Sequence, residues 1–281
     1  MTANDIKGVQ YSLVPHFDTD DYSITETFHE FTKLNRENIK ILMERVGTIV
    51  HDPRTRTMMA RSWKTYRGHK RIQMPPPQLG EMKLEDALRA RRSLSAFHGL
   101  SLSGEPITFA ELGGVLGLSY GVTAIRRIPE TTQDQAFRAA TSAGGIYPLE
   151  IYAVVFRVDG LEEGIYHYRA IDHSLEAVRL GPCQADFLQL TAFRDMCLKA
   201  ATVLVISAVF RRNLCKYLHR GYRFMMNDAG AVVQNMYLTG TALGLGTCAL
   251  GGFLDDDLGR LLGIDNVEEA PILGFVLGRL S

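Results

Sequence analysis

The sequence predicts an α+β layer fold in which a mixed β-sheet is wrapped by helices. Runs of β-branched, aromatic and aliphatic residues indicate buried strands, at 149–158, 164–169, 174–180, 201–210 and 271–277. Apolar residues at helical spacing predict helices among these strands, at 83–92, 108–120, 183–199, 229–243 and 255–262. Because apolar sheet faces must be buried, we expect the helices to cover them.

Composition and charge exclude several classes of protein. The 281 residues are 46% apolar and 22% charged, and the formal net charge is zero. This is ordinary globular composition and argues against nucleic-acid binding. The longest apolar stretch, near 201–210, is about half of a membrane span, and the first five residues lack the form of a signal peptide. We therefore expect a cytoplasmic protein.

The cysteines and histidines show no metal-ligand spacing. Cys183, Cys197, Cys215 and Cys248 form no Cys-x-x-Cys pair, and no His-Glu-x-x-His motif is present. The sequence therefore predicts reduced thiols and no metal site.

A run of three prolines, Pro75–Pro77, suggests a division of the chain. Consecutive prolines form a stiff, extended spacer. We therefore predict an N-terminal extension at 1–78 and a main domain at 79–281. Within the extension, 1–22 is expected to be irregular or an edge segment, and apolar spacing over 23–50 predicts one or two short helices.

A basic segment precedes the prolines. Between residues 53 and 80 there is no Asp or Glu, while seven cations occur there: Arg54, Arg56, Arg61, Lys64, Arg67, Lys70 and Arg71. The segment 54–71 fits two interpretations, a solvated basic connector or a docking surface for an acidic partner or peptide.

In the main domain, several local patterns are informative. Thr108 and Glu111 fit a capping box at the start of a helix. The stretch 121–140 is expected to be a loop with a basic patch. The small residues of 141–148 precede a strand and include Gly144 and Gly145, which would let backbone amides approach a ligand closely.

A polar cluster lies where the strand at 201–210 leads toward a helix. Six members fall within eight residues: Lys216, Tyr217, His219, Arg220, Tyr222 and Arg223. The cluster is either a basic, solvated loop with aromatic anchors or an active site, because α/β proteins often expose reactive groups at such transitions.

The glycine-rich stretches do not form a dinucleotide fingerprint, because Gly244 and Gly246 follow a helix and precede a strand. A flavin mononucleotide fits better. Arg91, Arg92 and Ser93 at a helix end, with Arg279 near the C-terminus, offer cations and a hydroxyl for its phosphate. Backbone groups of Leu250, Gly251 and Gly252 would reach the edge of its ring.

The combined motifs resemble the flavin-dependent nitroreductase superfamily, and within it the SagB-type azoline dehydrogenases of thiazole/oxazole-modified peptide biosynthesis. The resemblance covers about residues 84–281. It is carried by Arg91-Arg92-Ser93-Leu94-Ser95-Ala96-Phe97, by the capped helix 108–121, by 142–152 and 164–168, by Gln234-Asn235-Met236-Tyr237 and by 242–248.

The resemblance implies a nitroreductase-like fold, bound FMN and a homodimer with flavin sites at its interface. Ser142, Gly144 and Gly145 would then serve the flavin of the partner copy. Many nitroreductases carry Arg or Lys where this chain has Ser95, so that flavin contact is a weaker expectation. The family also implies an azoline-bearing precursor peptide, a YcaO-type cyclodehydratase and a peptide-recognition component as partners, in the biosynthesis of a bacteriocin or antibiotic.

The family's azole-forming members carry a Lys-Tyr catalytic pair, which corresponds here to Lys216 and Tyr217. Azoline oxidation removes a hydride, which passes to the flavin, and a proton, which needs a base. We hypothesise that Tyr217 accepts the proton and that Lys216 tunes it. Two alternatives remain, an NAD(P)H-dependent nitro- or ene-reductase and a flavin-bound scaffold of a synthetase complex.

Overall fold

A seven-stranded sheet forms the centre of the computed structural model, which describes residues 23–60 and 63–281. Its strand order is β1-β8-β7-β5-β9-β11-β10, and each pairing within it is antiparallel. The strands are β1 (Arg71–Gln73), β5 (Leu149–Val155), β7 (Gly164–Arg169), β8 (Ser174–Leu180), β9 (Thr202–Val209), β10 (Leu245–Leu250) and β11 (Glu269–Arg279). The expectation for residues 1–22 lies outside the described part of the chain.

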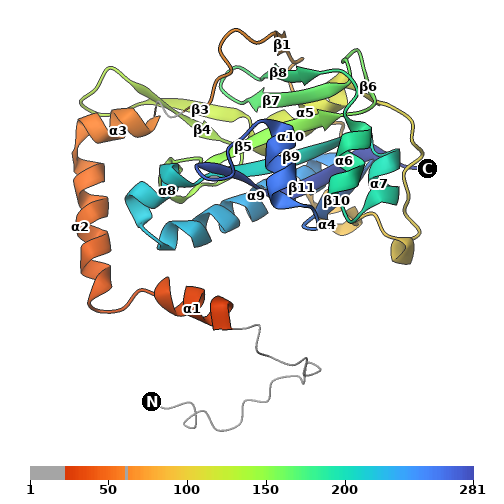
Figure 1. Ribbon diagram of the computed structural model, residues 1–281. Helices are drawn as coiled ribbons and strands as arrows, with labels where there is room; N and C mark the ends of the chain where they lie inside the picture. The colour runs from red at the N-terminus through yellow and green to blue at the C-terminus, as the bar shows by residue number, and fades with distance from the viewer. Residues whose placement is uncertain (1–22, 61–62) are drawn as a thin grey trace.

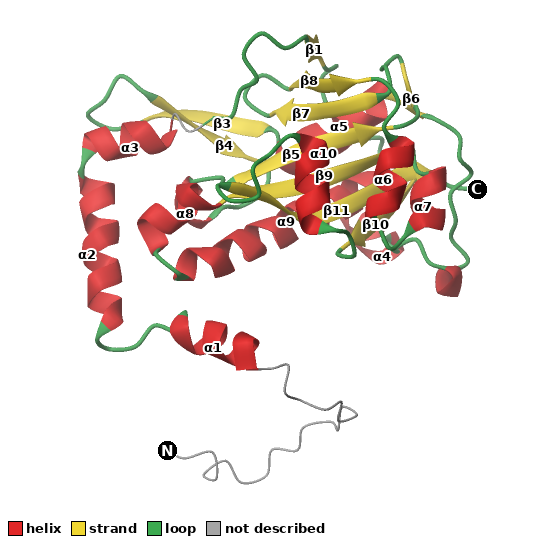
Figure 2. Cartoon of the chain, viewed as in Figure 1, coloured by secondary structure: helices red, strands yellow, loops and turns green. Residues whose placement is uncertain are grey.

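Helices cover both faces of this sheet (Figure 2). Successive strand residues point to opposite faces, so Leu149 and Ile151 of β5 belong to one core cluster, while Tyr152 and Val154 belong to the other. The first face packs against α5 (Phe109–Tyr120) and α9 (Arg220–Ala242). The second face packs against α6 (Gln184–Leu190), α7 (Arg194–Lys199) and α10 (Asp255–Leu262). The predicted α+β class is confirmed.

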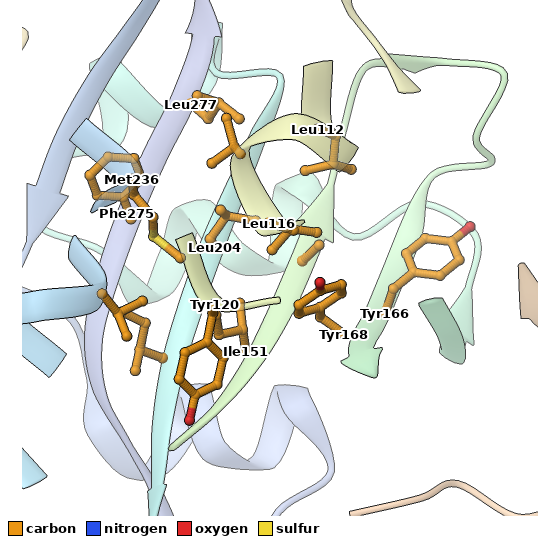
Figure 3. Close-up of a cluster of buried hydrophobic side chains, with 14 of the residues drawn as sticks. Leu112, Leu116, Tyr120, Ile151, Tyr166, Tyr168, Leu204, Met236, Phe275 and Leu277 are labelled. Carbon is orange, nitrogen blue, oxygen red and sulfur yellow. The ribbon is translucent and has the colours of Figure 1, made fainter. Parts of the chain in front are cut away.

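The larger core cluster lies between α5, α9 and the sheet (Figure 3). Leu112 and Leu116 of α5 are fully buried, and the hydroxyl of Tyr120 donates a hydrogen bond of 2.9 Å to the carbonyl of Leu149. A Cβ at Gly117 would lie 2.7 Å from the Pro77 side chain. The glycines of this helix therefore permit close packing, which offsets their low intrinsic helix propensity.

The capping box at the start of α5 is confirmed. The Thr108 hydroxyl accepts from the backbone N–H of Glu111 at 3.2 Å, and the Glu111 carboxylate accepts from the backbone N–H of Thr108 at 2.7 Å. The short α4 (Leu84–Ala90) precedes this helix. A parallel pair of two-residue strands, β2 (Ile107–Thr108) and β6 (Val158–Asp159), leads into it.

Two local predictions are wrong. The stretch 121–140 is a hairpin of β3 (Val122–Arg127) and β4 (Asp134–Arg138), not a loop. Much of β3 is exposed, so its polar residues conceal the alternation that indicates a half-buried strand. The single helix expected at 183–199 is divided into α6 and α7, because Ala192 donates a backbone hydrogen bond to the carbonyl of Gly252 instead of continuing a helix.

The N-terminal region forms an arm of three helices, residues 23–60, and a strap, residues 63–73. The predicted helices within 23–50 are confirmed as α1 (Ser23–Phe31) and α2 (Asn38–His51), which continue into α3 (Pro53–Ala60). Figure 1 shows α1 and α2 to one side of the sheet and its covering helices. The strap, residues 63–73, includes β1, so the sheet contains residues on the N-terminal side of the boundary predicted at 78. Among the described helices, none is long and apolar enough to cross a bilayer.

Part of the basic segment forms ion pairs with carboxylates on the second face of the sheet. Lys64 forms an ion pair with Glu269, and Arg71 lies 3.3 Å from Glu176. The imidazole of His167 lies between Glu176 and Glu150, 3.0 Å from each. These contacts assign Lys64 and Arg71 to internal pairing rather than to a free basic surface.

A docking surface within 54–71 remains a prediction for the exposed cations of the segment, Arg54, Arg67 and Lys70. Of the other two arginines, Arg56 lies 3.8 Å from the Glu130 carboxylate, and Arg61 lies outside the described residues.

Candidate active site

The predicted catalytic pair lies at the end of a helix. Strand β9 runs directly into α8 (Phe210–Tyr217), and Lys216 and Tyr217 occupy its last turn. Leu218, with φ of 51°, ends α8, and α9 begins at Arg220. The solvated-loop interpretation of this cluster is therefore wrong, and the long helix starts nine residues before the position predicted from its apolar spacing.

Both side chains of the pair converge on Gly144, in the short turn η4 (Ala143–Gly145). A Cβ built on Gly144 would lie 2.2 Å from the Tyr217 hydroxyl and 2.6 Å from the Lys216 ammonium nitrogen. Gly144 has φ of +64°, a conformation that favours glycine. The structure thus brings two predicted catalytic residues against one predicted cofactor residue that lies more than 70 positions earlier in the chain.

Burial shifts the protonation of the pair. Lys216 is only 7% exposed, and this desolvation lowers the pKa of its ammonium group below the usual lysine value. Burial, assisted by the negative charge of Asp228, raises the pKa of the Tyr217 hydroxyl. The first shift increases the neutral, proton-accepting fraction of Lys216, and the second decreases the tyrosinate fraction of Tyr217, so both shifts favour Lys216 over Tyr217 as the proton acceptor.

Asp228 supports the turn beneath this pair. It lies on α9 and is 4% exposed. Its carboxylate accepts hydrogen bonds from the Ser142 hydroxyl at 2.6 Å and from the Ala143 N–H at 3.2 Å. Burial raises the pKa of the Asp228 carboxyl, although these two donors oppose the shift. The sequence interpretation missed Asp228, because the helix was expected to begin one residue later.

A second cluster brings together Arg91, Ser93 and a residue to which no role was assigned, Tyr237. The Ser93 hydroxyl donates to the Tyr237 hydroxyl at 3.0 Å, and the Arg91 guanidinium lies 5.1 Å from the centre of the Tyr237 ring. The Tyr237 hydroxyl also accepts from the backbone N–H of Ala249 at 2.7 Å, next to the buried Leu250. Tyr237 therefore links the predicted phosphate donors to the strand end predicted to approach the flavin ring.

Arg279 is engaged elsewhere. Its guanidinium makes two hydrogen bonds of 2.8 Å to the Glu111 carboxylate, the group that also completes the capping box of α5. Arginine recognises phosphate and carboxylate with the same planar fork of donors. Arg279 would thus have to release Glu111 in order to bind a phosphate.

The remaining predicted cofactor residues make local contacts. Arg92 donates to the backbone carbonyls of Arg89 and Arg91 and is exposed. The Ser95 hydroxyl accepts from the Phe97 N–H at 3.1 Å and caps a short helix, η3 (Ala96–His98). The carbonyl of Gly145 accepts from the Gln135 side chain at 2.9 Å.

Gly251 is exposed, and no atom lies within 4 Å of the position that an added Cβ would occupy, whereas Gly252 packs against Phe193. The backbone beside Leu250 is therefore open at Gly251.

The residues present fit a flavin phosphate in part. A half-buried cation, Arg91, and a hydroxyl, Ser93, point at one another 3.4 Å apart, and such a donor pair suits a phosphate oxygen. Gly251 leaves open backbone nearby for the approach of a ring edge. Arg92 and Ser95 make only the local contacts described above and do not add to this donor pair.

The other charged members of the Lys216 cluster hold the N-terminal arm. Arg223 donates to the Thr32 hydroxyl at 2.8 Å and to the carbonyl of His29 at 2.6 Å, and Arg220 donates to the carbonyl of Thr32 at 3.1 Å. The ring of Tyr222 packs edge-on against Phe28, with centroids 5.3 Å apart. These residues therefore anchor α1 beside the start of α9.

A cavity of about 620 Å³ lies between the arm and α8, and neither residue of the predicted catalytic pair lines it. Its lining includes Ile146, which follows the η4 turn, and Cys215, which precedes Lys216. Apolar side chains from α2 and α3, among them Ile49 and Met58, complete one wall. The volume falls within the range of about 300–1,000 Å³ typical of small-molecule sites.

Comparison with known proteins defines the class. The model of the Nitroreductase family matches residues 119–279. A Methanocaldococcus jannaschii protein named as a nitroreductase, MJ1384, is 37% identical over 204 residues, which are 72% of this chain and 94% of that protein. The chain belongs to the nitroreductase family, and its predicted nitroreductase-like fold is confirmed.

Other relatives are named for microcin B17 and for trifolitoxin. The Microcin B17-processing protein McbC of Escherichia coli is 27% identical over 48% of this chain, and the trifolitoxin operon protein TfxC of Rhizobium leguminosarum is 26% identical over 60%. The matched regions cover 52% of McbC and 48% of TfxC, about half of each protein.

Solved structures support the fold. An Anabaena variabilis protein named as a nitroreductase superposes with a TM-score of 0.68 at 22% identity, covering 96% of this chain and 48% of that chain. A chain of the E. coli microcin synthetase McbBCD complex with truncated pro-MccB17 superposes with a TM-score of 0.56 at 19% identity, covering 89% of this chain and 98% of that chain.

Proposed function

We propose that this protein is an FMN-dependent azoline dehydrogenase, which oxidises thiazolines or oxazolines in a ribosomally made peptide to azoles. The observation that carries the proposal is the convergence of the Lys216 nitrogen and the Tyr217 hydroxyl on the Gly144 turn. Similarity to proteins named for microcin B17 and trifolitoxin processing supports the peptide substrate.

In this proposal, the two residues of the pair have different roles. Bound FMN supplies an acceptor for the hydride that leaves one ring carbon of the azoline. Lys216, whose pKa is lowered by burial, takes the proton from the adjacent carbon. Tyr217, whose raised pKa keeps its hydroxyl protonated, orients the ring by donating a hydrogen bond. These roles reverse the hypothesis drawn from the sequence, in which Tyr217 accepts the proton.

Arg91 and Ser93 would hold the FMN phosphate, and the open backbone at Gly251 would approach the ring. The 620 Å³ cavity lined by Cys215 would admit residues of the peptide that flank the azoline. We also propose that the protein acts as a homodimer, with the turn 142–145 facing the partner's flavin. It would work in the cytoplasm with a YcaO-type cyclodehydratase and a peptide-recognition component.

One observation favours a second candidate function. MJ1384, whose matched region spans nearly its whole length, is named as a nitroreductase. An NAD(P)H-dependent nitro- or ene-reductase would use the same cofactor residues and would not need a base at Lys216.

A substrate assay distinguishes the two candidates. The purified protein, reconstituted with FMN, is incubated with an azoline-bearing peptide, and mass spectrometry measures the loss of two hydrogens per ring. Lys216→Ala with equal FMN content is the control, and we expect it to lose about 100- to 10,000-fold of the rate. Rapid NAD(P)H oxidation with a nitroarene, unaffected by Lys216→Ala and without azole formation, would identify the reductase instead.

A further inference from the structure

We propose that Asp228 is a positioning residue that holds the 142–145 turn against the reactive pair and places its carboxylate charge near the Tyr217 hydroxyl. The inference rests on the proposed function, because it assigns Asp228 a part in the same site. Neither the nitroreductase motifs recognised in the sequence nor the predicted site residues include this carboxylate.

The contacts of Asp228 define a clamp between two distant segments. Its carboxylate on α9 accepts hydrogen bonds from the Ser142 hydroxyl and the Ala143 N–H. The same hydroxyl oxygen accepts from the backbone N–H of Tyr147 at 2.9 Å, so Ser142 ties both ends of the turn to α9. Gly144 sits between these tied ends, where Lys216 and Tyr217 meet it.

The location of the charge gives the clamp a second effect. Asp228 is 4% exposed, so bulk water screens its charge weakly. A nearby carboxylate disfavours tyrosinate, and it contributes to the raised pKa of Tyr217. Phe224 lies 4.9 Å and the Lys216 ammonium 5.2 Å from the centre of the Tyr217 ring, and the Gly144 turn faces its hydroxyl. Beside burial, the charge of Asp228 favours the neutral hydroxyl of Tyr217.

Two substitutions separate the hydrogen bonds from the charge. Asp228→Asn keeps the size of the side chain and removes its charge, whereas Ser142→Ala removes both hydrogen bonds of the Ser142 hydroxyl, to Asp228 and from Tyr147, and keeps the charge. Labelled tyrosine rings report the pKa of Tyr217 by NMR titration, and the resonance is assigned by its absence in Tyr217→Phe. We expect Asp228→Asn to lower this pKa, because the nearby negative charge is removed, and Ser142→Ala to leave it at or above the wild-type value.

Activity should follow in parallel. We expect both variants to lower kcat by about 10- to 100-fold with a smaller change in KM, because the reactive groups lose their alignment. In Asp228→Asn the alkaline limb of the pH–rate profile should also move to lower pH.

Glu269→Gln is the matched control. It neutralises another buried carboxylate, which lies on β11 and contacts Lys64, Tyr152 and Ser207 rather than the reactive pair. This variant should show the wild-type Tyr217 titration and pH profile. An unchanged Tyr217 pKa in Asp228→Asn would overturn the inference, as would an equal loss of kcat in Glu269→Gln. The titration needs no azoline, so a protein inactive on azolines would refute the proposed function while the NMR result still decides this inference.

Discussion

Replacing Gly144 with alanine should disable the reactive pair while leaving the fold intact. The new Cβ would lie 2.2 Å from the Tyr217 hydroxyl and 2.6 Å from the Lys216 nitrogen, whereas ordinary contact begins at 3.4 Å. The Tyr217 hydroxyl must therefore move by roughly 1 Å, and a displacement of that size at reacting groups costs about 100-fold in rate. This corresponds to about 2.7 kcal/mol of transition-state stabilisation.

Alanine at this position also strains the backbone, because φ is +64°. That strain costs about 1–2 kcal/mol, and the melting temperature should fall by about 2–4 °C for each kcal/mol. Gly263→Ala is the control for strain alone. Gly263 has φ of +72°, and no atom lies within 4 Å of the position that an added Cβ would occupy.

The assay compares the two variants, each reconstituted with FMN to the same flavin content, for azole formation from an azoline-bearing peptide. Gly263→Ala should lose a similar amount of thermal stability and retain its rate. If Gly144→Ala oxidises azolines as fast as Gly263→Ala, the convergence at Gly144 is not the site of reaction, and our assignment of Lys216 and Tyr217 is refuted.

Three further predictions concern other parts of the site. Glu111→Gln keeps a capping residue but weakens the hold on Arg279, so it should tighten FMN binding by about tenfold in a fluorescence titration; weaker binding would mean that Glu111 orients Arg279. Arg223→Ala removes the donor to Thr32 and His29, so α1 should detach and be cleaved faster in limited proteolysis, with the core protected; an unchanged cleavage rate would refute the anchoring role. Because burial lowers the pKa of Lys216, the unfolded chain binds more protons between that lowered value and the usual lysine pKa, and stability rises with pH across this interval. Lys216→Met should therefore abolish oxidation, raise the melting temperature at neutral pH by a few degrees and flatten the dependence of the melting temperature on pH. Calorimetry over a range of pH measures both effects on stability, and a lower melting temperature at neutral pH would contradict the prediction.

Local patterns were enough to predict much of the architecture. Runs of β-branched, aromatic and aliphatic residues located β5, β7, β8, β9 and β11, and the Thr108–Glu111 pair located the start of α5, because these signals are properties of neighbouring residues. The hairpin at 122–138 escaped prediction, since an exposed β3 shows no clear alternation. The adjacency of Lys216 and Tyr217 was likewise visible in the sequence, because both belong to one short motif.

The charges of the N-terminal segment illustrate the opposite case. Between residues 53 and 80 the sequence contains no acidic residue, so its cations look uncompensated. In the folded chain, Lys64 pairs with Glu269 and Arg71 with Glu176. Each partner lies on a strand more than 100 residues away, and local composition carries no information about such pairing.

By itself, therefore, the sequence determined the α+β class and the family, and it was enough to predict Lys216 and Tyr217 as the reactive pair. Only the tertiary structure placed Gly144 against Lys216 and Tyr217, and Asp228 beneath the turn that contains Gly144. Only the tertiary structure, too, favoured Lys216 over Tyr217 as the base, since burial shifts both pKa values. The physical reason is the same in each case: desolvation and contact depend on which distant segments pack together, whereas periodicity and motifs report only on neighbours along the chain.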